Sequence, residues 1–212
     1  MIVLIILFCS PSNAQTFGLK GGLSLANMLT KDDDGTYSND YKMNPGFHIG
    51  ATLGLPFTHF LSLESGLLLT TKGAKYEDEV MGVDVSAKTD LYYLDIPVTL
   101  KAAHELSRGI KIIGAVGPYV GVGISGKAKA TAKYQGTEVS ASEDISWGND
   151  EDEDDLKRLD LGLTVGGGVE INAIQIGISY DMGLSNISAY QEYGTINKNR
   201  LFKFSVGYRF GN

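Results

Sequence analysis

The sequence lacks the features of several common protein classes. It has more acidic than basic residues, giving a formal net charge of −7, and its Lys and Arg residues are scattered. Because a nucleic-acid binding protein needs a basic footprint, this balance argues against a nucleic-acid partner. Proline is scarce, with 5 residues, whereas the 27 glycines are nearly twice the average usage of about 7%. This composition is neither that of a disordered chain nor that of collagen.

Cysteine and long apolar runs are nearly absent as well. Residues Ile2–Phe8 form a short apolar run, and Ser12-Asn13-Ala14 provides a small-x-small cleavage site. We therefore predict a signal peptide at residues 1–14 and a single mature domain at residues 15–212. Cleavage would remove Cys9, the only cysteine, so no disulfide is expected. After Gln15 there is no run of about 18 apolar residues that could form a transmembrane helix. An exported chain of this kind is either a soluble secreted protein or an outer-membrane barrel.

Within the closing stretch Arg200–Phe210, the residues from Phe202 onward alternate strictly between two kinds. Its even positions from Phe202 to Phe210 are apolar or aromatic, and the odd positions between them are polar or small. Such alternation places the two sets on opposite faces of one β-strand. A transmembrane barrel strand has this pattern, because its apolar face meets lipid and its polar face lines the interior.

The same period of two recurs seven more times, in segments near the about 9–11 residues that a tilted membrane strand needs. These segments are Thr16–Met28, Pro45–Leu55, Phe60–Lys72, Leu91–Lys101, Ile110–Ile124, Arg158–Ile171 and Ile174–Leu184. Short and long connections alternate between them. The short ones are Pro56–His59, Ala102–Gly109 and Asn172–Ala173, and the long polar ones are Leu29–Asn44, Gly73–Asp90, Ser125–Lys157 and Ser185–Asn199. The sequence therefore predicts an all-β fold, an eight-stranded antiparallel transmembrane up-and-down β-barrel.

Several stretches resemble the PorT-type family of outer-membrane β-barrel proteins. They are Gln15–Asn27, Leu61–Lys75, Tyr93–Leu100, Gly114–Gly121, Leu159–Val169 and the closing Phe204–Phe210. The resemblance implies a small eight-stranded barrel in the bacterial outer membrane. It also suggests an accessory role in a protein-secretion machine. One departure is that Gly211-Asn212 follow Phe210, whereas barrels of this kind often end on the aromatic residue.

Charged residues recur at positions that the alternation turns inward. They are Lys20, Glu64, Lys72, Asp95, Lys101, Lys111, Asp160, Glu170, Asp181, Lys203 and Arg209. An eight-stranded barrel is only wide enough for its own side chains, and buried charges must pair. We therefore expect a polar network that fills the lumen; a proton or ion path is the alternative.

Three other patterns are candidates for a nucleotide site, a calcium site and a catalytic site. Gly121, Gly123 and Gly126 match the dinucleotide fingerprint, but no helix is expected after them, so a nucleotide site is not predicted. The acidic run at residues 150–155 offers Asp150, Asp152 and Asp154 as weak calcium candidates, although such runs are usually just solvated. We predict no other metal site and no cofactor. The inward His48 could in principle serve catalysis, but no G-x-S-x-G motif supports an enzyme.

Taken together, the residues predict a non-enzymatic barrel with a side-chain-filled lumen and long, acid-rich external loops. Its expected partners are outer-membrane lipid and other envelope proteins, which the external loops would contact. Two alternatives stay open. One is an accessory of a protein-secretion machine, and the other is a soluble exported, lipocalin-like barrel that holds an apolar ligand inside.

Overall fold

The computed structural model describes residues 15–33, 35, 41–80, 82–134, 137–190 and 194–210. The predicted signal peptide at residues 1–14 and the closing Gly211-Asn212 lie outside the described residues. In the described part of the chain, no helix is long and apolar enough to cross a membrane. The strands are β1 (Thr16–Lys31), β2 (Tyr41–Lys42), β3 (Asn44–Pro56), β4 (Leu61–Val80), β5 (Val83–Ser107), β6 (Ile110–Tyr134), β7 (Thr137–Asp144), β8 (Leu159–Ile171), β9 (Ile174–Gly183) and β10 (Ile196–Phe210).

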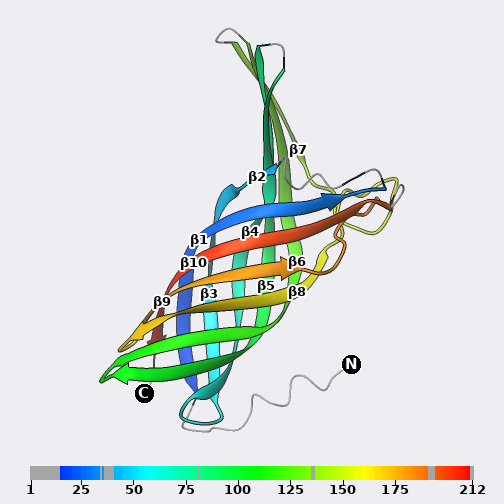
Figure 1. Ribbon diagram of the computed structural model, residues 1–212. Helices are drawn as coiled ribbons and strands as arrows, with labels where there is room; N and C mark the ends of the chain where they lie inside the picture. Colours follow the sequence, from blue (N-terminus) through cyan, green and yellow to red (C-terminus); the bar gives the residue numbers. More distant parts are fainter. Residues whose placement is uncertain are drawn as a thin grey trace.

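Eight of these strands close into a ring in the order β1, β3, β4, β5, β6, β8, β9 and β10 (Figure 1). Every neighbouring pair is antiparallel, and β10 pairs back with β1 from Phe17↔Phe210 to Lys31↔Ile196. Because the ring closes, its strands have no free edge along the barrel wall. The predicted eight-stranded up-and-down barrel is confirmed.

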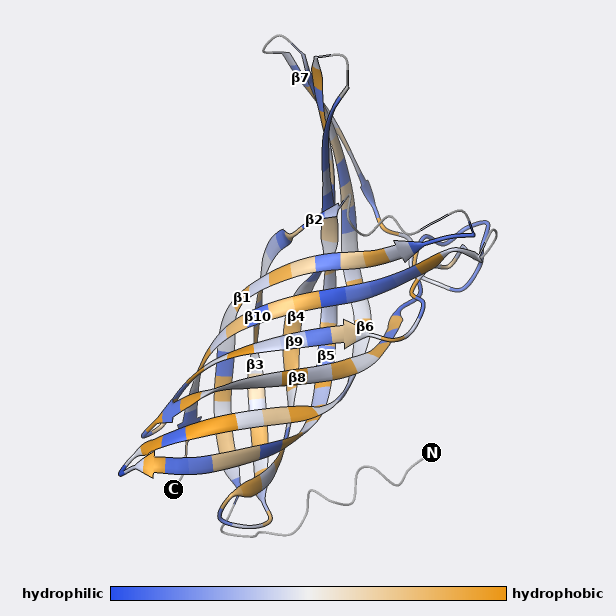
Figure 2. Cartoon of the chain, viewed as in Figure 1, coloured by the Kyte–Doolittle hydropathy of each residue, from blue (hydrophilic) through white to orange (hydrophobic). Residues whose placement is uncertain are grey.

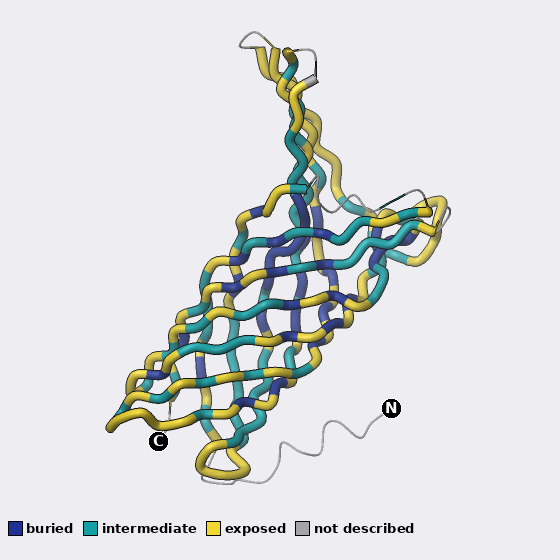
Figure 3. Tube along the Cα trace, in the orientation of Figure 1, coloured by how far each residue is buried: buried dark blue, intermediate teal, exposed yellow. Residues whose placement is uncertain are grey.

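The two faces of the ring strands differ as the alternation predicts. On β1, Leu23 is 67% exposed on the outside, and the next residue, Ser24, is fully buried inside. Exposed and buried positions alternate in this way along the wall, and apolar and polar residues alternate with them (Figures 2 and 3). A soluble barrel would bury its apolar face. This barrel buries its polar face, so the lipocalin-like alternative is wrong.

One end of the barrel carries only short turns, at residues 57–60, 108–109 and 172–173, and we call it the short-turn end. Gly109 and Asn172 both have positive φ, 78° and 55°, the left-handed conformation that Gly and Asn adopt most readily. The backbone N–H of Asn172 donates to the Gly109 carbonyl oxygen at 2.7 Å. This contact joins two neighbouring turns.

The opposite end differs from the sequence prediction. Gly73–Asp90 and most of Ser125–Lys157 were predicted to be loops, but β4, β5 and β6 continue well beyond the ring as paired strands. With β2 on one side and β7 on the other, they form a projecting sheet in the order β2, β4, β5, β6, β7. We call this sheet the blade; it comprises β2, residues 73–80 of β4, 83–90 of β5, 127–134 of β6, and β7. It stands above the ring in Figure 1.

The loop prediction was wrong because the blade has no strongly apolar face. Its strands mix Lys, Glu, Asp, Ser and Thr on one side with mostly Ala, Val and Tyr on the other, as in the segment Lys127–Tyr134. The hydropathy of these strands therefore resembles that of a polar loop, although their two kinds of residue still alternate with a period of two. Backbone pairing of neighbouring strands, which composition does not report, holds the blade together.

Candidate functional site

The half of the lumen nearer the blade, called the outer half below, contains a buried charged cluster centred on Lys72 of β4. Its Nζ donates to Asp95 Oδ1 and to Asp160 Oδ2, both at 2.9 Å, and all three side chains are almost fully buried. The ammonium also lies 4.6 Å from the ring centroid of Tyr93 and 4.5 Å from that of Tyr119. Aromatic faces and two carboxylates thus surround a single cation.

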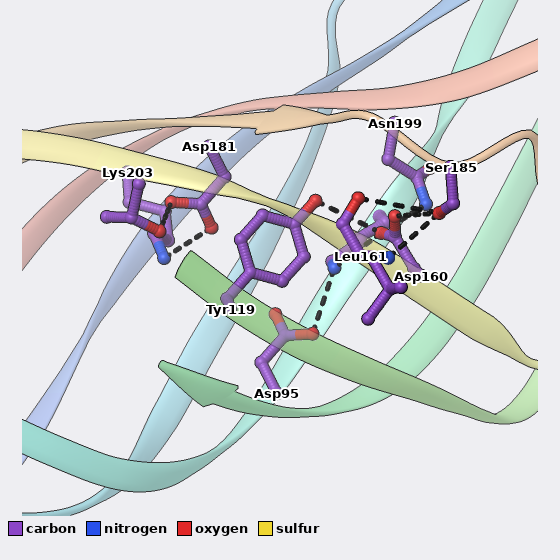
Figure 4. Close-up of polar contacts among 10 residues, drawn as sticks. Asp95, Tyr119, Asp160, Leu161, Asp181, Ser185, Asn199 and Lys203 are labelled. Atoms are coloured by element: carbon purple, nitrogen blue, oxygen red, sulfur yellow. Dashed lines mark hydrogen bonds and ion pairs between the residues drawn. The ribbon is translucent and has the colours of Figure 1, made fainter. Parts of the chain in front are cut away.

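Asp160 also receives the hydrogen bonds from uncharged side chains in this cluster (Figure 4). It accepts hydrogen bonds from Tyr119 at 3.2 Å, Asn199 Nδ2 at 2.9 Å and Ser185 Oγ at 3.3 Å. A buried ion pair contributes little net stability, but removing one partner leaves an uncompensated charge, at a cost of about 3–5 kcal/mol. The cluster therefore fixes the relative positions of the strands that it joins.

Midway along the lumen lies a second polar layer. Lys203 pairs with Asp181 at 2.5 Å, and Thr164 Oγ1 donates to Asp181 at 2.8 Å. His48 lies on the other side of this layer, with Nδ1 at 3.3 Å from Ser24 Oγ and Nε2 at 2.9 Å from Ser205 Oγ. These contacts use both ring nitrogens of His48.

The short-turn end holds a third charged layer, built around two carboxylates. Glu64 accepts from Lys20 at 2.8 Å and from Lys101 at 2.9 Å. Glu170 lies 2.8 Å from Arg209 and 3.8 Å from Lys111, and it accepts from Gln175 at 2.7 Å. These side chains line a cavity of about 390 Å³. The sequence predicted a lumen filled with side chains along its whole length. This prediction is wrong at the short-turn end, which holds the cavity.

The structure thus brings all eleven inward charged residues from the sequence into three layers of ion pairs. Sequence reasoning missed Asn199 and Ser185, which were assigned to a loop. Asn199 lies on β10, at a position that continues the inward alternation of Leu201 and Lys203. Extending the period of two past Arg200 would have identified it. Ser185 follows the end of β9, where no alternation applies.

An apolar plug closes the outer mouth above the Lys72 cluster. Its buried members are Met28, Ala74, Leu91, Tyr93, Leu156 and Ile187, with Tyr41, Ile145 and Trp147 packed against them. The segment 145–158 turns back into the mouth, and the Trp147 ring meets the Tyr93 ring edge-on at 5.6 Å. Leu156 pairs with Ser188 in an isolated bridge. The sequence predicts residues 145–157 to be part of an external loop, and Arg158 to begin the next strand.

The plug explains the glycines that match the dinucleotide fingerprint. A Cβ on Gly123 would lie 2.3 Å from the Trp147 ring, and one on Gly121 would lie 2.5 Å from Asp95 Oδ1. A Cβ on Gly126 would crowd Leu91 and Ile145. After Gly126, β6 continues as a strand to Tyr134. These glycines make room for side chains in the mouth.

Two of the three calcium candidates, Asp150 and Asp154, accept hydrogen bonds from their own loop through their carboxylates. Asp154 accepts from the backbone N–H of Asp150 at 2.9 Å and from Ser146 Oγ at 3.2 Å, and Asp150 accepts from the N–H of Asp152 at 3.1 Å. Over the described ranges, no three His, Cys, Asp or Glu side chains come close enough together to hold a metal ion. The contacts order a turn of the loop.

The remaining histidines lie near the short-turn end. His59 packs edge-on against Phe60 at 5.2 Å in the turn, and His104 lies on β5 opposite Ile112. Neither approaches His48, which is buried among the lumen strands. The structure therefore does not bring the histidines together as one site.

On the side continuous with the outer wall, the blade carries a row of lysines and acidic residues that pair with them. Strand register places Lys42, Lys75, Lys88 and Lys129 in one row across four neighbouring strands. Lys42 pairs with Glu77 at 2.8 Å, Lys75 also pairs with Glu77, and Lys88 pairs with Asp90 at 2.8 Å. Hydrogen bonds from Lys42 and Lys75 lower the pKa of the exposed Glu77 carboxyl to about 2. Acids thus neutralise much of the lysine row.

Strand β7 forms the outer edge of the blade. It pairs only with β6 among the described strands, from Lys127↔Asp144 to Tyr134↔Thr137, and all eight of its residues are exposed. It carries Glu138, Glu143 and Asp144 and has no basic residue. An exposed edge strand is a template for pairing with another chain. The sequence does not distinguish β7 from its surroundings, because it lies inside a predicted loop.

Comparison with known structures finds proteins that match nearly the whole chain. Ail, the attachment invasion locus protein of Yersinia pestis, is 17% identical, with 94% of this chain and 100% of that chain covered and a TM-score of 0.35. OprG from Pseudomonas aeruginosa is 13% identical, with 94% and 98% covered and a TM-score of 0.48. Neisserial surface protein A is 13% identical, with 92% and 97% covered and a TM-score of 0.38. Comparison with curated proteins gives no match.

Comparison with protein families gives the assignment. Residues 13–189 match the family described as "Outer membrane protein beta-barrel domain", and this match covers most of the chain. The ring of eight strands with an apolar exterior and a polar interior has the architecture of such a protein. The chain therefore belongs to the outer membrane protein β-barrel domain family and lies in the bacterial outer membrane.

Proposed function

We propose that this barrel is a non-enzymatic binding protein of the cell envelope, and that the blade is its contact surface. One observation carries the proposal: the chain continues strands beyond the ring into the blade, which ends in the exposed edge strand β7. Short turns face the periplasm in barrels of this kind, so the blade faces the exterior. The ring serves as an anchor in outer-membrane lipid, through its apolar exterior.

The difference between the connections at the two ends of the barrel supports this role. At the short-turn end, two connections are two-residue turns, which offer little surface. At the other end, paired strands keep the blade extended without an apolar core of its own. Because ordering so many polar residues costs conformational entropy, a protein that needed only a membrane anchor would have little reason to keep them.

Interior geometry supports the non-enzymatic part of the proposal. His48 and its two serine partners form the arrangement that comes nearest to a nucleophile and base, but His48 is 1% exposed and Ser24 is fully buried. A catalytic base also needs a third group that orients it, and both ring nitrogens of His48 already face hydroxyl groups. A substrate from outside would have to displace the plug to reach this pair.

A pull-down from native envelopes, solubilised in mild detergent, tests the blade. One variant replaces residues 130–141 with an Asn-Gly turn between the paired residues Lys129 and Ser142. A matched variant replaces residues 78–85 between Glu77 and Ser86 and leaves β7 in place. Proteins captured by the wild type should be lost with the first variant. If both trimmed chains capture the same proteins as the wild type, the blade is not the contact surface.

The resemblance to the PorT-type family supports a more specific alternative, an accessory role in a protein-secretion machine. Six stretches of the mature chain carry that resemblance. The same pull-down separates the two proposals: a secretion accessory should retain a fixed set of envelope proteins at constant ratios, and it should retain them in both trimmed variants if the ring makes the contact.

A further inference from the structure

The cavity at the short-turn end carries an excess of positive charge. Lys20, Lys101, Lys111 and Arg209 line it, together with the carboxylates of Glu64 and Glu170. Each carboxylate is shared between two cations, Glu64 by Lys20 and Lys101, and Glu170 by Lys111 and Arg209. Four cations thus face two carboxylates within about 390 Å³.

The other two layers of the lumen do not share this excess. In the outer layer, two carboxylates, Asp95 and Asp160, hold the single cation Lys72. In the middle layer, Lys203 and Asp181 balance each other. Uncompensated positive charge among the described lumen residues is therefore confined to the short-turn end, where water-sized space is available.

The donors in this cavity are only partly used by the ion pairs. The Nζ of Lys111 lies 3.8 Å from Glu170, beyond hydrogen-bond distance, and its side chain is 34% exposed. The Nε of Arg209 is buried and has no hydrogen-bond partner among the described residues. Lys20 keeps donors beyond the one that it gives to Glu64, because an ammonium group has three. Unused donors and excess charge point to the same kind of ligand.

We propose that this cavity is a binding site for a small, soluble, multiply charged oxyanion of the phosphate class, which enters from the periplasmic side. The size of the cavity admits such an ion with some of its water. Its four lining cations outnumber the carboxylates even when Glu105, which lies opposite Lys111 on β5, is counted with Glu64 and Glu170. Lipid phosphates are an unsuitable source, because the strands of the ring wall separate the cavity from the bilayer. The plug and the Lys72 cluster close the lumen on the outer side.

Titration of the full chain with inorganic phosphate tests the site. The protein is folded in maltoside micelles, which contain no phosphate, and binding heat is measured at constant ionic strength. We expect saturable binding that Lys111→Gln weakens about tenfold, since a hydrogen bond to a charged group is commonly worth this much. Lys111→Arg should restore most of the affinity. Lys129→Gln, on the blade, makes the same charge change outside the lumen and should bind phosphate like the wild type.

Folding of each variant is checked by its shifted mobility on an unboiled SDS gel. If Lys111→Gln does not fold, Arg209→Gln tests the same pair from β10 and should show a similar loss. Absence of saturable phosphate binding to the wild type would overturn the proposal. So would equal weakening by Lys111→Gln and Lys129→Gln, because it would show that net charge alone sets the affinity. Neither result bears on the blade.

Discussion

Arginine substitutions along the outward face of β8 should map the membrane across the barrel wall. The series consists of Leu159, Leu161, Leu163, Val165, Val169 and Ile171, all of them exposed apolar residues. Val165 is the central residue of this 13-residue strand, opposite Val116 on β6 and Tyr180 on β9. Each substitution places a guanidinium group at a different depth in the same bilayer.

The expected loss of stability depends on depth. Arginine at the bilayer midplane costs about 2–4 kcal/mol, and the cost falls to about 0–1 kcal/mol near the interfaces. We therefore expect a profile that peaks at Leu163 and Val165 and declines toward Leu159 and Ile171. Near the strand ends, the long arginine side chain can reach the interface, whereas at the centre it cannot do so without disturbing lipid.

Substitutions at Thr164, between the two central positions, provide the control for the inward face. Its hydroxyl donates to Asp181 at 2.8 Å. Thr164→Ser keeps this donor and should have an effect below about 1 kcal/mol, whereas Thr164→Val should lose about 1–3 kcal/mol. The valine variant removes one of the groups that satisfy the buried carboxylate. It also adds no charge to the lumen.

Refolding into lipid vesicles, followed by urea titration, measures all of these variants. A flat profile along β8, or a maximum at the strand ends, would refute the assignment of this face to lipid. The same conclusion would follow if the wild-type chain folded without lipid and Leu163→Arg abolished that folding. In that case the leucine would belong to an apolar core rather than to a lipid-facing surface.

Three further predictions concern the whole ring. The folded barrel should resist SDS until it is boiled, because unfolding needs concerted rupture of a closed set of strand hydrogen bonds; identical mobility of boiled and unboiled samples would contradict closure. Purified protein in planar bilayers should show no steady conductance, because the Lys72 cluster and the plug close the outer half; regular single-channel steps would contradict this. Lys72→Met should lose about 3–5 kcal/mol in the same urea titration, because it leaves Asp95 and Asp160 buried without their cation, and a loss below about 1 kcal/mol would show that the carboxylates find other compensation.

Sequence periodicity alone was sufficient to predict the ring. A strand has a side-chain period of two, so the sequence shows directly which residues share a face. Leu23 and Ser24, or Leu163 and Thr164, could be assigned to opposite faces without coordinates, and the structure agrees. The alternation of short and long connections further indicated which end of the barrel has only turns. Both signals are local, which is why one sequence suffices to read them.

The blade was missed although it is also built from strands. Residues 127–133 alternate Lys or Thr with Ala, but neither face of this segment is apolar enough to distinguish it from a solvated loop. Its strands form because β4, β5 and β6 already lie side by side in the ring and continue their pairing outward. Register in the ring, more than hydropathy, determines where such strands end.

The sequence by itself predicted a set of inward-facing charged residues, whereas only the tertiary structure decided which of them meet. Lys72 pairs with Asp95, 23 residues away, and with Asp160, 88 residues away. Both contacts depend on the register of several strands and on closure between β1 and β10. The cation excess at the short-turn end likewise follows from how these layers divide the charges. Alternation along one strand carries no information about that division, because it depends on the height at which each strand joins its neighbour.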